Sequence, residues 1–225
     1  MEINEAFFLT YSESLFKAIS NNSGGLYKPK TQAKMKFGKP QLDENGAERK
    51  RDMFSPDYQL KRKQREVNHL LKPIGLPFSM YGGISKRSNI ENAQMHVDSK
   101  FFLTIDLKNY FNNISNDQVY QTLIGYGINK RISRAITRIS TVNYALPQGA
   151  PTSTMLANLV FASTAIELEA LCAKRKIIFT NFVDDLTFSS KKDFKQLIPQ
   201  ILALLKKNGF VVNQKKSIIE DGDVR

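Results

Sequence analysis

Apolar runs alternate with polar, turn-forming segments along the chain, and this alternation predicts both strands and helices. Short runs rich in β-branched and aromatic residues, at 101–106 and on both sides of Asp184, are typical of strands. Strands that alternate with helices and include an antiparallel hairpin indicate an α+β fold with helices on one face of a sheet. Apolar residues at helical spacing predict helices at 1–20, 58–71, 88–97, 116–126, 129–140, 152–174 and 193–208, and a last strand is expected at 210–212.

The segment from Lys28 to Arg65 is densely basic and carries a hairpin pattern. Strands expected at 33–42 and 47–54 flank a turn that ends in Asn-Gly. For the basic helix expected at 58–71, a solvated helix face is the ordinary explanation. In the whole chain, 33 Lys and Arg face 21 Asp and Glu, a formal net charge of +12. Such an excess favours a polyanionic partner, either nucleic acid or an anionic membrane surface.

Composition excludes several other classes of protein. The chain has 225 residues, of which 41% are hydrophobic, as in an ordinary soluble globular protein. A single cysteine, Cys172, excludes an internal disulfide and is expected to pack within a helix, and two histidines give no zinc site. We find no apolar stretch of about 18 residues that would span a bilayer, and the acidic N-terminus does not resemble a secretory signal. We therefore expect a cytoplasmic protein without a membrane partner.

Two adjacent aspartates, Asp184 and Asp185, interrupt the apolar run at 177–188. Like charges repel and aspartate is depleted in strands, so the pair fits the tip of a tight hairpin; a solvated acidic turn is its commonest explanation. Asp106 ends another strand, where it either caps the next helix or joins the pair in one sheet. Three carboxylates at one point repel unless cations lie between them, a geometry that matches two-metal phosphoryl transfer.

Five segments in a fixed order make the chain recognisable. They read YGGISKRSNIENAQMHV at 81–97, FFLTIDLKNYFNNI at 101–114, LPQGAPTS at 146–153, FVDD at 182–185 and GFVVNQKKS at 209–217. In form and order they resemble bacterial reverse transcriptases, the group that contains retron, group II intron and defence-associated enzymes. FVDD has Phe in place of the usual Tyr, and the first segment is similar to one typical of retron-like members. The resemblance covers the chain from about Lys28 to its end.

The resemblance implies a metal site and a catalytic lysine. Asp106, Asp184 and Asp185 would be the catalytic acids that bind two Mg²⁺ ions, with Mn²⁺ as a substitute, and the carbonyl of Leu107 would be a further ligand. Lys216 would donate a proton to the leaving pyrophosphate or neutralise its charge. Lys215 is adjacent to it, so the choice between them rests on spacing alone.

The resemblance also implies a nucleotide site. Phe111 would be the steric gate that clashes with a ribose 2′-hydroxyl, although a core aromatic is the ordinary explanation and the gate could instead be Tyr110. Glycine in the LPQGAPTS segment would allow close backbone approach to the nucleotide; a Pro-containing loop before a helix is its alternative. The residues expected to contact the incoming nucleotide are Lys50, Arg51, Tyr110, Phe111, Gln148 and Gly149.

A right-hand polymerase core follows from the same resemblance. We expect an N-terminal helical segment at 1–27, fingers at 28–99 that also receive part of 116–150, and a palm at 100–225 built on a ferredoxin-like antiparallel sheet. Family members usually continue into a primer-contacting hairpin and a thumb. Because the sequence stops where that hairpin should begin, we expect the thumb to be absent. Three explanations stay open: the sequence is a fragment, a second polypeptide supplies the thumb, or the protein works without one. Without a thumb, we expect duplex retention to be weak.

The expected activity is RNA-directed DNA polymerisation. The chain would transfer dNMP from a dNTP to the 3′-hydroxyl of a DNA or RNA primer on an RNA template, in a retron or antiphage-defence system. Two alternatives stay open. One is a catalytically impaired scaffold that binds nucleic acid, and the other is a template-independent or protein-primed polymerase that needs a partner's thumb.

Overall fold

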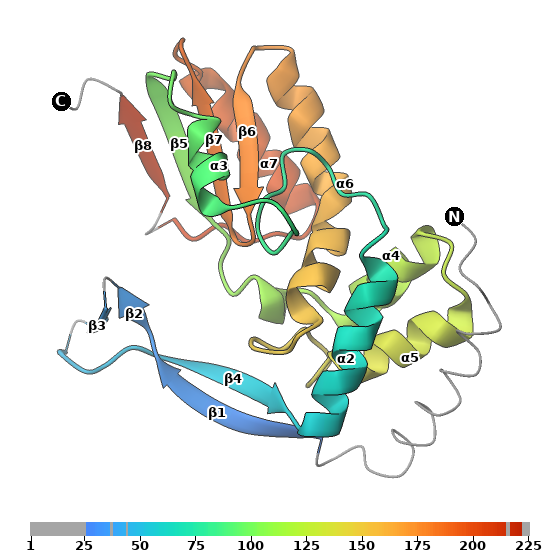
Figure 1. Cartoon of the computed structure of the whole chain (residues 1–225). Coiled ribbons are helices and arrows are strands. Elements are labelled where there is room, and N and C mark those ends of the chain that lie inside the picture. Colours follow the sequence, from blue (N-terminus) through green and yellow to red (C-terminus); the bar gives the residue numbers. More distant parts are fainter. Residues whose placement is uncertain (1–25, 37, 44, 215–216, 222–225) are drawn as a thin grey trace. The chain divides into compact units, whose positions relative to one another are not determined.

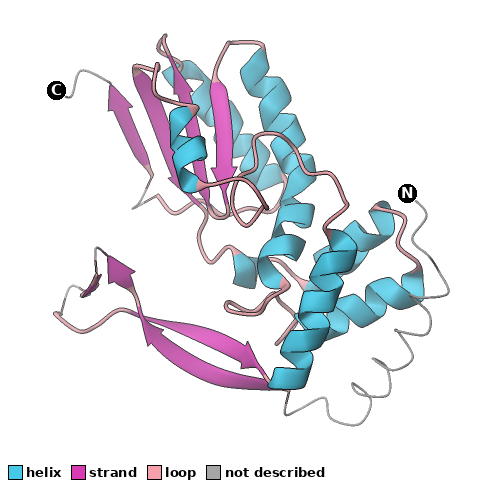
Figure 2. Cartoon of the chain, in the orientation of Figure 1, coloured by secondary structure: helices cyan, strands magenta, loops and turns pink. Residues whose placement is uncertain are grey.

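The computed structural model describes residues 26–36, 38–43, 45–214 and 217–221 and has an α+β fold (Figures 1 and 2). The described chain forms two compact units. The first contains the residues up to Leu70 together with Ser115–Ser153, and the second contains Leu71–Ile114 and the residues from Thr154 onward. The helix expected at 1–20, most of the segment 1–27, and the two candidate lysines Lys215 and Lys216 lie outside the described residues.

A two-stranded basic ribbon opens the first unit. β1 (Tyr27–Ala33) pairs antiparallel with β4 (Lys50–Pro56), and between them β2 (Met35–Lys36) pairs with β3 (Lys39–Pro40). The prediction of one continuous strand at 33–42 is therefore wrong. Most side chains of β1 are exposed, so no buried face fixes which residues pair.

Three helices complete the described part of the first unit, and all three were expected. They are α2 (Tyr58–Leu71), α4 (Asn116–Gly125) and α5 (Lys130–Ser140). Gln64 on α2 is fully buried, and its amide donates hydrogen bonds to the Tyr27 hydroxyl at 2.6 Å and to the Ile139 carbonyl at 2.7 Å. These bonds join the ribbon, α2 and α5 within one core.

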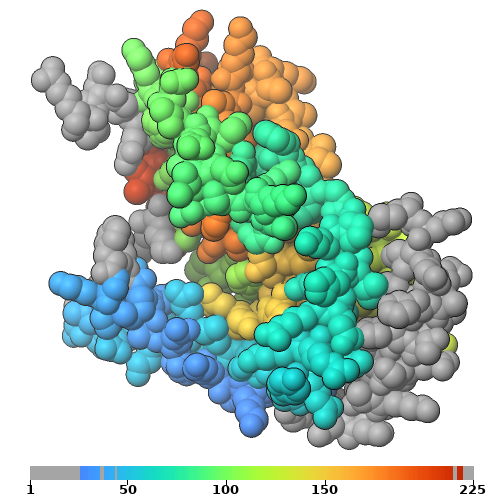
Figure 3. Space-filling model, in the orientation of Figure 1, coloured from blue at the N-terminus to red at the C-terminus, as the bar shows by residue number. Residues whose placement is uncertain are grey.

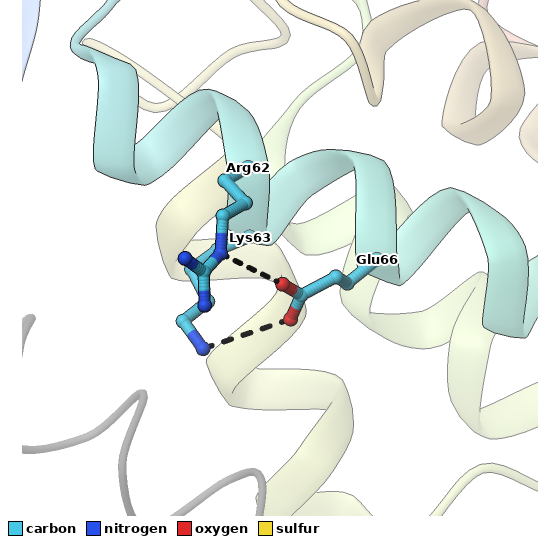
Figure 4. Close-up of polar contacts among 3 residues, drawn as sticks. All are labelled: Arg62, Lys63 and Glu66. Carbon is cyan, nitrogen blue, oxygen red and sulfur yellow. Dashed lines mark hydrogen bonds and ion pairs between the residues drawn. The ribbon is translucent and has the colours of Figure 1, made fainter.

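The exposed face of α2 carries an ion-pair cluster (Figure 4). The Glu66 carboxylate lies 3.3 Å from the Arg62 guanidinium and 3.6 Å from the Lys63 ammonium. Pairs of this kind on a surface contribute about 0–1 kcal/mol each. They are what a solvated helix face is expected to show.

A four-stranded antiparallel sheet forms the second unit, in the order β6-β7-β5-β8. Its strands are β6 (Ile178–Phe182), β7 (Asp185–Ser190), β5 (Phe101–Asp106) and β8 (Ile218–Asp221). Four of the side chains that face the core are at most 2% exposed: Leu103, Ile105, Leu186 and Phe188. α6 (Ser153–Ala173) and α7 (Ile198–Lys207) lie behind the sheet in the view of Figure 1. The short α3 (Asn89–Gln94) contacts β6.

Two expected elements of the second unit differ from the structure. The strand expected at 210–212 is only an isolated bridge between Val212 and Leu107, and the fourth strand of the sheet is β8 instead. The helix expected at 193–208 begins at Ile198, after a 3₁₀ turn at Lys195–Leu197. Pro199 lies in the first turn of α7, where its missing N–H leaves no hydrogen bond unmade.

Helix α6 corrects the expectation that no apolar stretch is long enough to span a bilayer. Its 21 residues are long and apolar enough to cross a membrane, but 56% of the apolar window is buried inside the protein, as in the core helix of a soluble protein. Cys172, near the end of α6, is buried, and burial raises the pKa of its thiol to about 12. A thiol so hard to ionise fits the packing role expected for it.

Candidate functional site

The three candidate acids lie at one end of the sheet in the second unit, at the end of β5 and at the turn between β6 and β7. The register of β5 and β7 places Asp106 directly opposite Asp185, and the Leu107 amide donates a hydrogen bond of 2.8 Å to the Asp184 carbonyl. Opposite residues in an antiparallel pair have Cβ atoms about 5 Å apart. Two like charges that close destabilise the strand pair unless something compensates them.

The turn that carries the aspartates is backbone-strained. Val183 has a φ of 60°, in the left-handed region that a β-branched residue rarely adopts. That conformation costs about 1–2 kcal/mol, so neighbouring contacts must hold it. The buried Asn181 side-chain amide donates a 2.7 Å hydrogen bond to the Val183 carbonyl and is one such contact.

A glycine loop packs against the same turn, and sequence reasoning missed its role. The Tyr81 amide donates to the Asn181 carbonyl at 2.7 Å, and the Asn158 side chain donates to the Gly82 carbonyl at 2.8 Å. A Cβ on Gly82 would lie 2.5 Å from the Val183 backbone nitrogen. Figure 3 shows the segment around α3 in green beside the orange strands. The Gly-Gly pair in YGGISKRSNIENAQMHV was the signal in the sequence.

Asn213 is a second residue of the site to which the sequence assigned no role. Its side-chain amide donates a hydrogen bond of 2.8 Å to Asp106 Oδ1, and its backbone N–H donates another of 2.8 Å to the Asp106 carbonyl. Together they fix both the backbone and the carboxylate of the first acid. The signal was the Asn that precedes Lys216 by three positions in GFVVNQKKS.

The two adjacent aromatic candidates have different surroundings. Tyr110 is 4% exposed, its hydroxyl donates to the Ala157 carbonyl at 3.2 Å, and its ring lies 6.3 Å from that of Phe161. Burial, and then the charge of Asp184, raise the pKa of Tyr110. Phe111 is only half-buried, at the start of the 3₁₀ turn Phe111–Asn113. Phe111 is therefore the better placed of the two to meet a ligand.

The other nucleotide-site candidates lie in the first unit, where the structure brings their two segments together. The Phe54 amide on β4 donates a 3.1 Å hydrogen bond to the Gln148 carbonyl. Gly149 has a φ of 100°, which favours glycine. Lys50 and Arg51 lie earlier on the same strand β4, with Lys50 exposed and Arg51 half-buried.

The oxygen atoms of the candidate acids and of the Leu107 carbonyl are suitable ligands for a hard cation, but they are not arranged as a complete metal site. Within the described ranges, no group of three or more His, Cys, Asp or Glu side chains is positioned to hold a metal ion. Carboxylate and backbone carbonyl oxygens are nevertheless the ligands that Mg²⁺ prefers. Asp106, Asp184, Asp185 and the Leu107 carbonyl supply this chemistry at one end of the sheet.

Comparison with known proteins gives a consistent family. The model of the reverse transcriptase (RNA-dependent DNA polymerase) family matches residues 44–221. The retron Ec86 reverse transcriptase of Escherichia coli is 32% identical over 184 residues, covering 79% of this chain and 57% of that protein. The retron Se72 enzyme of Salmonella heidelberg is 27% identical over 187 residues, covering 79% and 49%.

The retron Mx162 enzyme of Myxococcus xanthus is 29% identical over 162 residues, covering 64% of this chain and 33% of its own length. The chain thus spans about half the length, or less, of the curated relatives that it matches. The family match covers the acid hairpin, Asp106 and the LPQGAPTS segment alike. The chain belongs to the reverse transcriptase (RNA-dependent DNA polymerase) family.

Proposed function

We propose that this chain carries the catalytic core of an RNA-directed DNA polymerase of the retron type. The observation that supports the proposal is the β5–β7 register, in which Asp106 lies opposite Asp185, the residue that follows Asp184, in a chain of this family. The reaction is transfer of dNMP from a dNTP to a primer 3′-hydroxyl on an RNA template, with release of pyrophosphate. The assignment to a retron system is supported by the relatives, which are retron reverse transcriptases.

Asp106, Asp184 and Asp185 are the acids that hold two divalent cations, Mg²⁺ or in its place Mn²⁺, with the Leu107 carbonyl as a further ligand. When bound, such cations lower the pKa of the attacking hydroxyl and stabilise the leaving group. Asn213 is a positioning residue, because its amide fixes the direction in which the Asp106 carboxylate points. Cations between the acids would also offset the repulsion across β5 and β7.

The remaining residues bind and orient the nucleotide. Phe111 excludes the ribose 2′-hydroxyl, and Gln148 and Gly149 lie against the incoming dNTP. Lys50 and Arg51 pair with the triphosphate, since ammonium and guanidinium groups both bind phosphate. Lys216, outside the described residues, neutralises or protonates the pyrophosphate.

Within the polymerase hand, the first unit corresponds to fingers and the second to a palm with a ferredoxin-like sheet. Residues 71–99, which the sequence assigned to the fingers, pack with the palm candidate. The partners are an RNA template, a DNA or RNA primer and dNTPs. We propose that a thumb, where it comes from a second polypeptide, would raise retention of the template–primer duplex.

Primer extension on an RNA template with Mg²⁺ and dNTPs tests the function. Wild type should extend the primer, and the double substitution Asp184→Asn with Asp185→Asn should abolish extension while RNA binding remains. Asp98→Asn, which removes one exposed carboxylate elsewhere, is the matched control and should leave extension unchanged. RNA binding without extension, with or without an added polypeptide that carries a thumb, would support the scaffold instead. Extension without any template would support the template-independent alternative.

A further inference from the structure

In the first unit, α4 and α5 pack against each other (Figure 1). A groove is lined by residues of both helices and of the turn that follows α5. Its volume is about 630 Å³, and its walls mix basic, aromatic and hydroxyl groups. None of the residues that line the groove is one of the three candidate catalytic acids or one of the nucleotide-site candidates. The lining residues include Asp117, Tyr120, Arg134, Thr137, Arg138 and Tyr144.

Two arginines stand one helical turn apart on the exposed face of α5. Arg134 and Arg138 are four residues apart, which places their side chains side by side. Within the described part of the chain, neither guanidinium makes an ion pair or a hydrogen bond. Asp117, in the first turn of α4, is the one acid among the lining residues, so the lining keeps a net positive charge. Two free guanidinium groups suit a phosphate.

A strained turn holds an aromatic ring at the same groove. Val142 and Ala145 exchange hydrogen bonds of 2.9 and 3.1 Å, and the two residues between them have φ angles of 51° (Asn143) and 64° (Tyr144). Positive φ at both central residues is the type I′ turn, in which glycine is preferred at the second position. Tyr144 occupies that position and is 81% exposed.

The strain at Tyr144 has no packing reason, because the ring is in solvent. The turn itself is anchored, since the Asn116 amide at the start of α4 donates a 2.8 Å hydrogen bond to the Tyr144 carbonyl. Strained backbone is kept where the surrounding structure holds it, and it clusters at binding sites. A rigidly held, exposed tyrosine beside two unpaired arginines combines a stacking surface with a phosphate site.

We propose that this groove binds a segment of single-stranded polynucleotide, with one base stacked on Tyr144 and the adjoining phosphate held by Arg134 and Arg138. A single strand is favoured over a duplex because a base must be unstacked to lie on an aromatic ring. Asp117 is placed to accept a hydrogen bond from a base amino group, and the Thr137 hydroxyl lines the same wall. The inference goes beyond the polymerase function, since this binding needs no catalysis.

The test measures binding of a labelled single-stranded oligonucleotide of about 12 nucleotides by fluorescence anisotropy, without dNTPs. RNA and DNA of one sequence are compared, because both carry the base and phosphate that the groove would recognise. Tyr144→Ala should weaken binding of at least one of them by about 5- to 100-fold, whereas Tyr144→Phe should bind as wild type does. Unchanged binding by Tyr144→Ala would overturn the proposal.

Tyr144→Gly separates binding from folding. Glycine adopts the positive φ without strain, so the unfolding midpoint should stay the same or rise by up to about 4 °C. The same variant should bind as weakly as Tyr144→Ala. If Tyr144→Gly is fully folded and binds the oligonucleotide as wild type does, the proposal is contradicted as directly as by unchanged binding of Tyr144→Ala.

The arginines are tested by salt dependence with a charge-matched control. Arg134→Ala with Arg138→Ala should reduce the slope of log affinity against log salt by about 0.7–1.4, as for the loss of one or two phosphate contacts to a single strand. Lys174→Ala with Arg175→Ala removes the same charge from exposed positions in the second unit and should change the slope less. If the salt slope changes equally in the two double variants, the arginines contribute only general electrostatic attraction, and the proposal that the groove binds a single strand is contradicted.

Discussion

Two antiparallel strand pairs, the acid hairpin and the basic ribbon, differ in how firmly their structure is held. The acid hairpin, β6 and β7, has a buried face, and its turn is held by Asn181 and by the loop at Gly82. The basic ribbon, β1 and β4, has side chains that are mostly exposed along β1. Pairing in the acid hairpin is fixed because both strands are largely buried, and a slip of one residue would move every side chain of the slipped strand to the opposite face. No such penalty fixes the basic ribbon.

The difference matches the work that we propose for each hairpin. Carboxylates that hold metal ions must be placed accurately, because metal ligands and reacting atoms tolerate small displacements only. Long Lys and Arg side chains on an exposed ribbon reach a triphosphate from a range of backbone positions. The following substitutions test this contrast, from the largest expected effect to the smallest.

Gly82→Ala should disrupt the acid hairpin most. The added methyl would lie 2.5 Å from the Val183 backbone nitrogen, so either the loop or the turn must move. We expect a loss of about 3 kcal/mol in the free energy of unfolding, measured by urea denaturation, and at least a tenfold loss of extension activity. Gly75→Ala is the control, since no atom lies within 4 Å of the added Cβ. Equal stability of the two variants would show that the loop does not support the turn.

Asn213→Ala should impair catalysis more than folding. Loss of the 2.8 Å hydrogen bond to Asp106 frees the carboxylate to rotate, and bonds to charged groups contribute about 1.5–3 kcal/mol. We expect kcat to fall by about 10- to 100-fold while KM for dNTP stays constant. Asn208→Ala removes another part-buried amide-to-carboxylate bond, 3.2 Å long and made to Glu167 instead of a candidate acid, and should leave kcat unchanged. A change in KM alone would contradict a positioning role for Asn213.

His96 should make the sheet that carries the acid hairpin sensitive to acid. Its ring nitrogens lie 2.6 Å from the Ser189 hydroxyl and 2.7 Å from the Thr180 hydroxyl, and burial lowers its pKa from 6.5 to about 4. The unfolded chain therefore binds the proton more readily, so this stability is present above pH 6.5 and is lost as the pH falls towards 4.

We expect a loss of about 1–2 kcal/mol between those pH values, measured by denaturation at each pH. His96→Gln does not titrate, so its stability should change less over the same range. Parallel pH profiles of the two proteins would show that His96 does not control this loss.

Lys50→Ala with Arg51→Ala should leave stability almost unchanged. Lys50 is exposed and Arg51 is half-buried, and surface substitutions of this kind change the free energy of unfolding by about 0.5 kcal/mol or less. The proposed triphosphate contact predicts instead a rise of about tenfold in KM for dNTP, measured by steady-state extension. A large loss of stability would contradict the view that the ribbon, unlike the acid hairpin, does not depend on these side chains for its structure. An unchanged KM for dNTP would contradict the proposed triphosphate contact.

The sequence correctly predicted the strands and helices in which the spacing of apolar residues matches the face that is buried in the structure. The aspartate hairpin and α2 were found because alternation or helical spacing coincides with a buried face. The ribbon pairing was missed because β1 is mostly polar and exposed, so no alternation of apolar residues marks it as a strand. The supporting role of Gly82 was missed because it depends on a contact between distant segments, which no local pattern shows. β8 was missed for the same reason, since its pairing partner is β5, more than a hundred residues earlier.

The most direct test of the metal site counts bound Mn²⁺ by electron paramagnetic resonance. The protein is saturated with an RNA template, a primer that lacks its 3′-hydroxyl, and a dNTP, so that binding is measured without reaction. Wild type should bind two ions, and Asp106→Asn should lose at least one of them, whereas Asp98→Asn should retain both. Equal Mn²⁺ binding by wild type and Asp106→Asn would contradict the account that Asp106, Asp184 and Asp185 form one metal-binding centre.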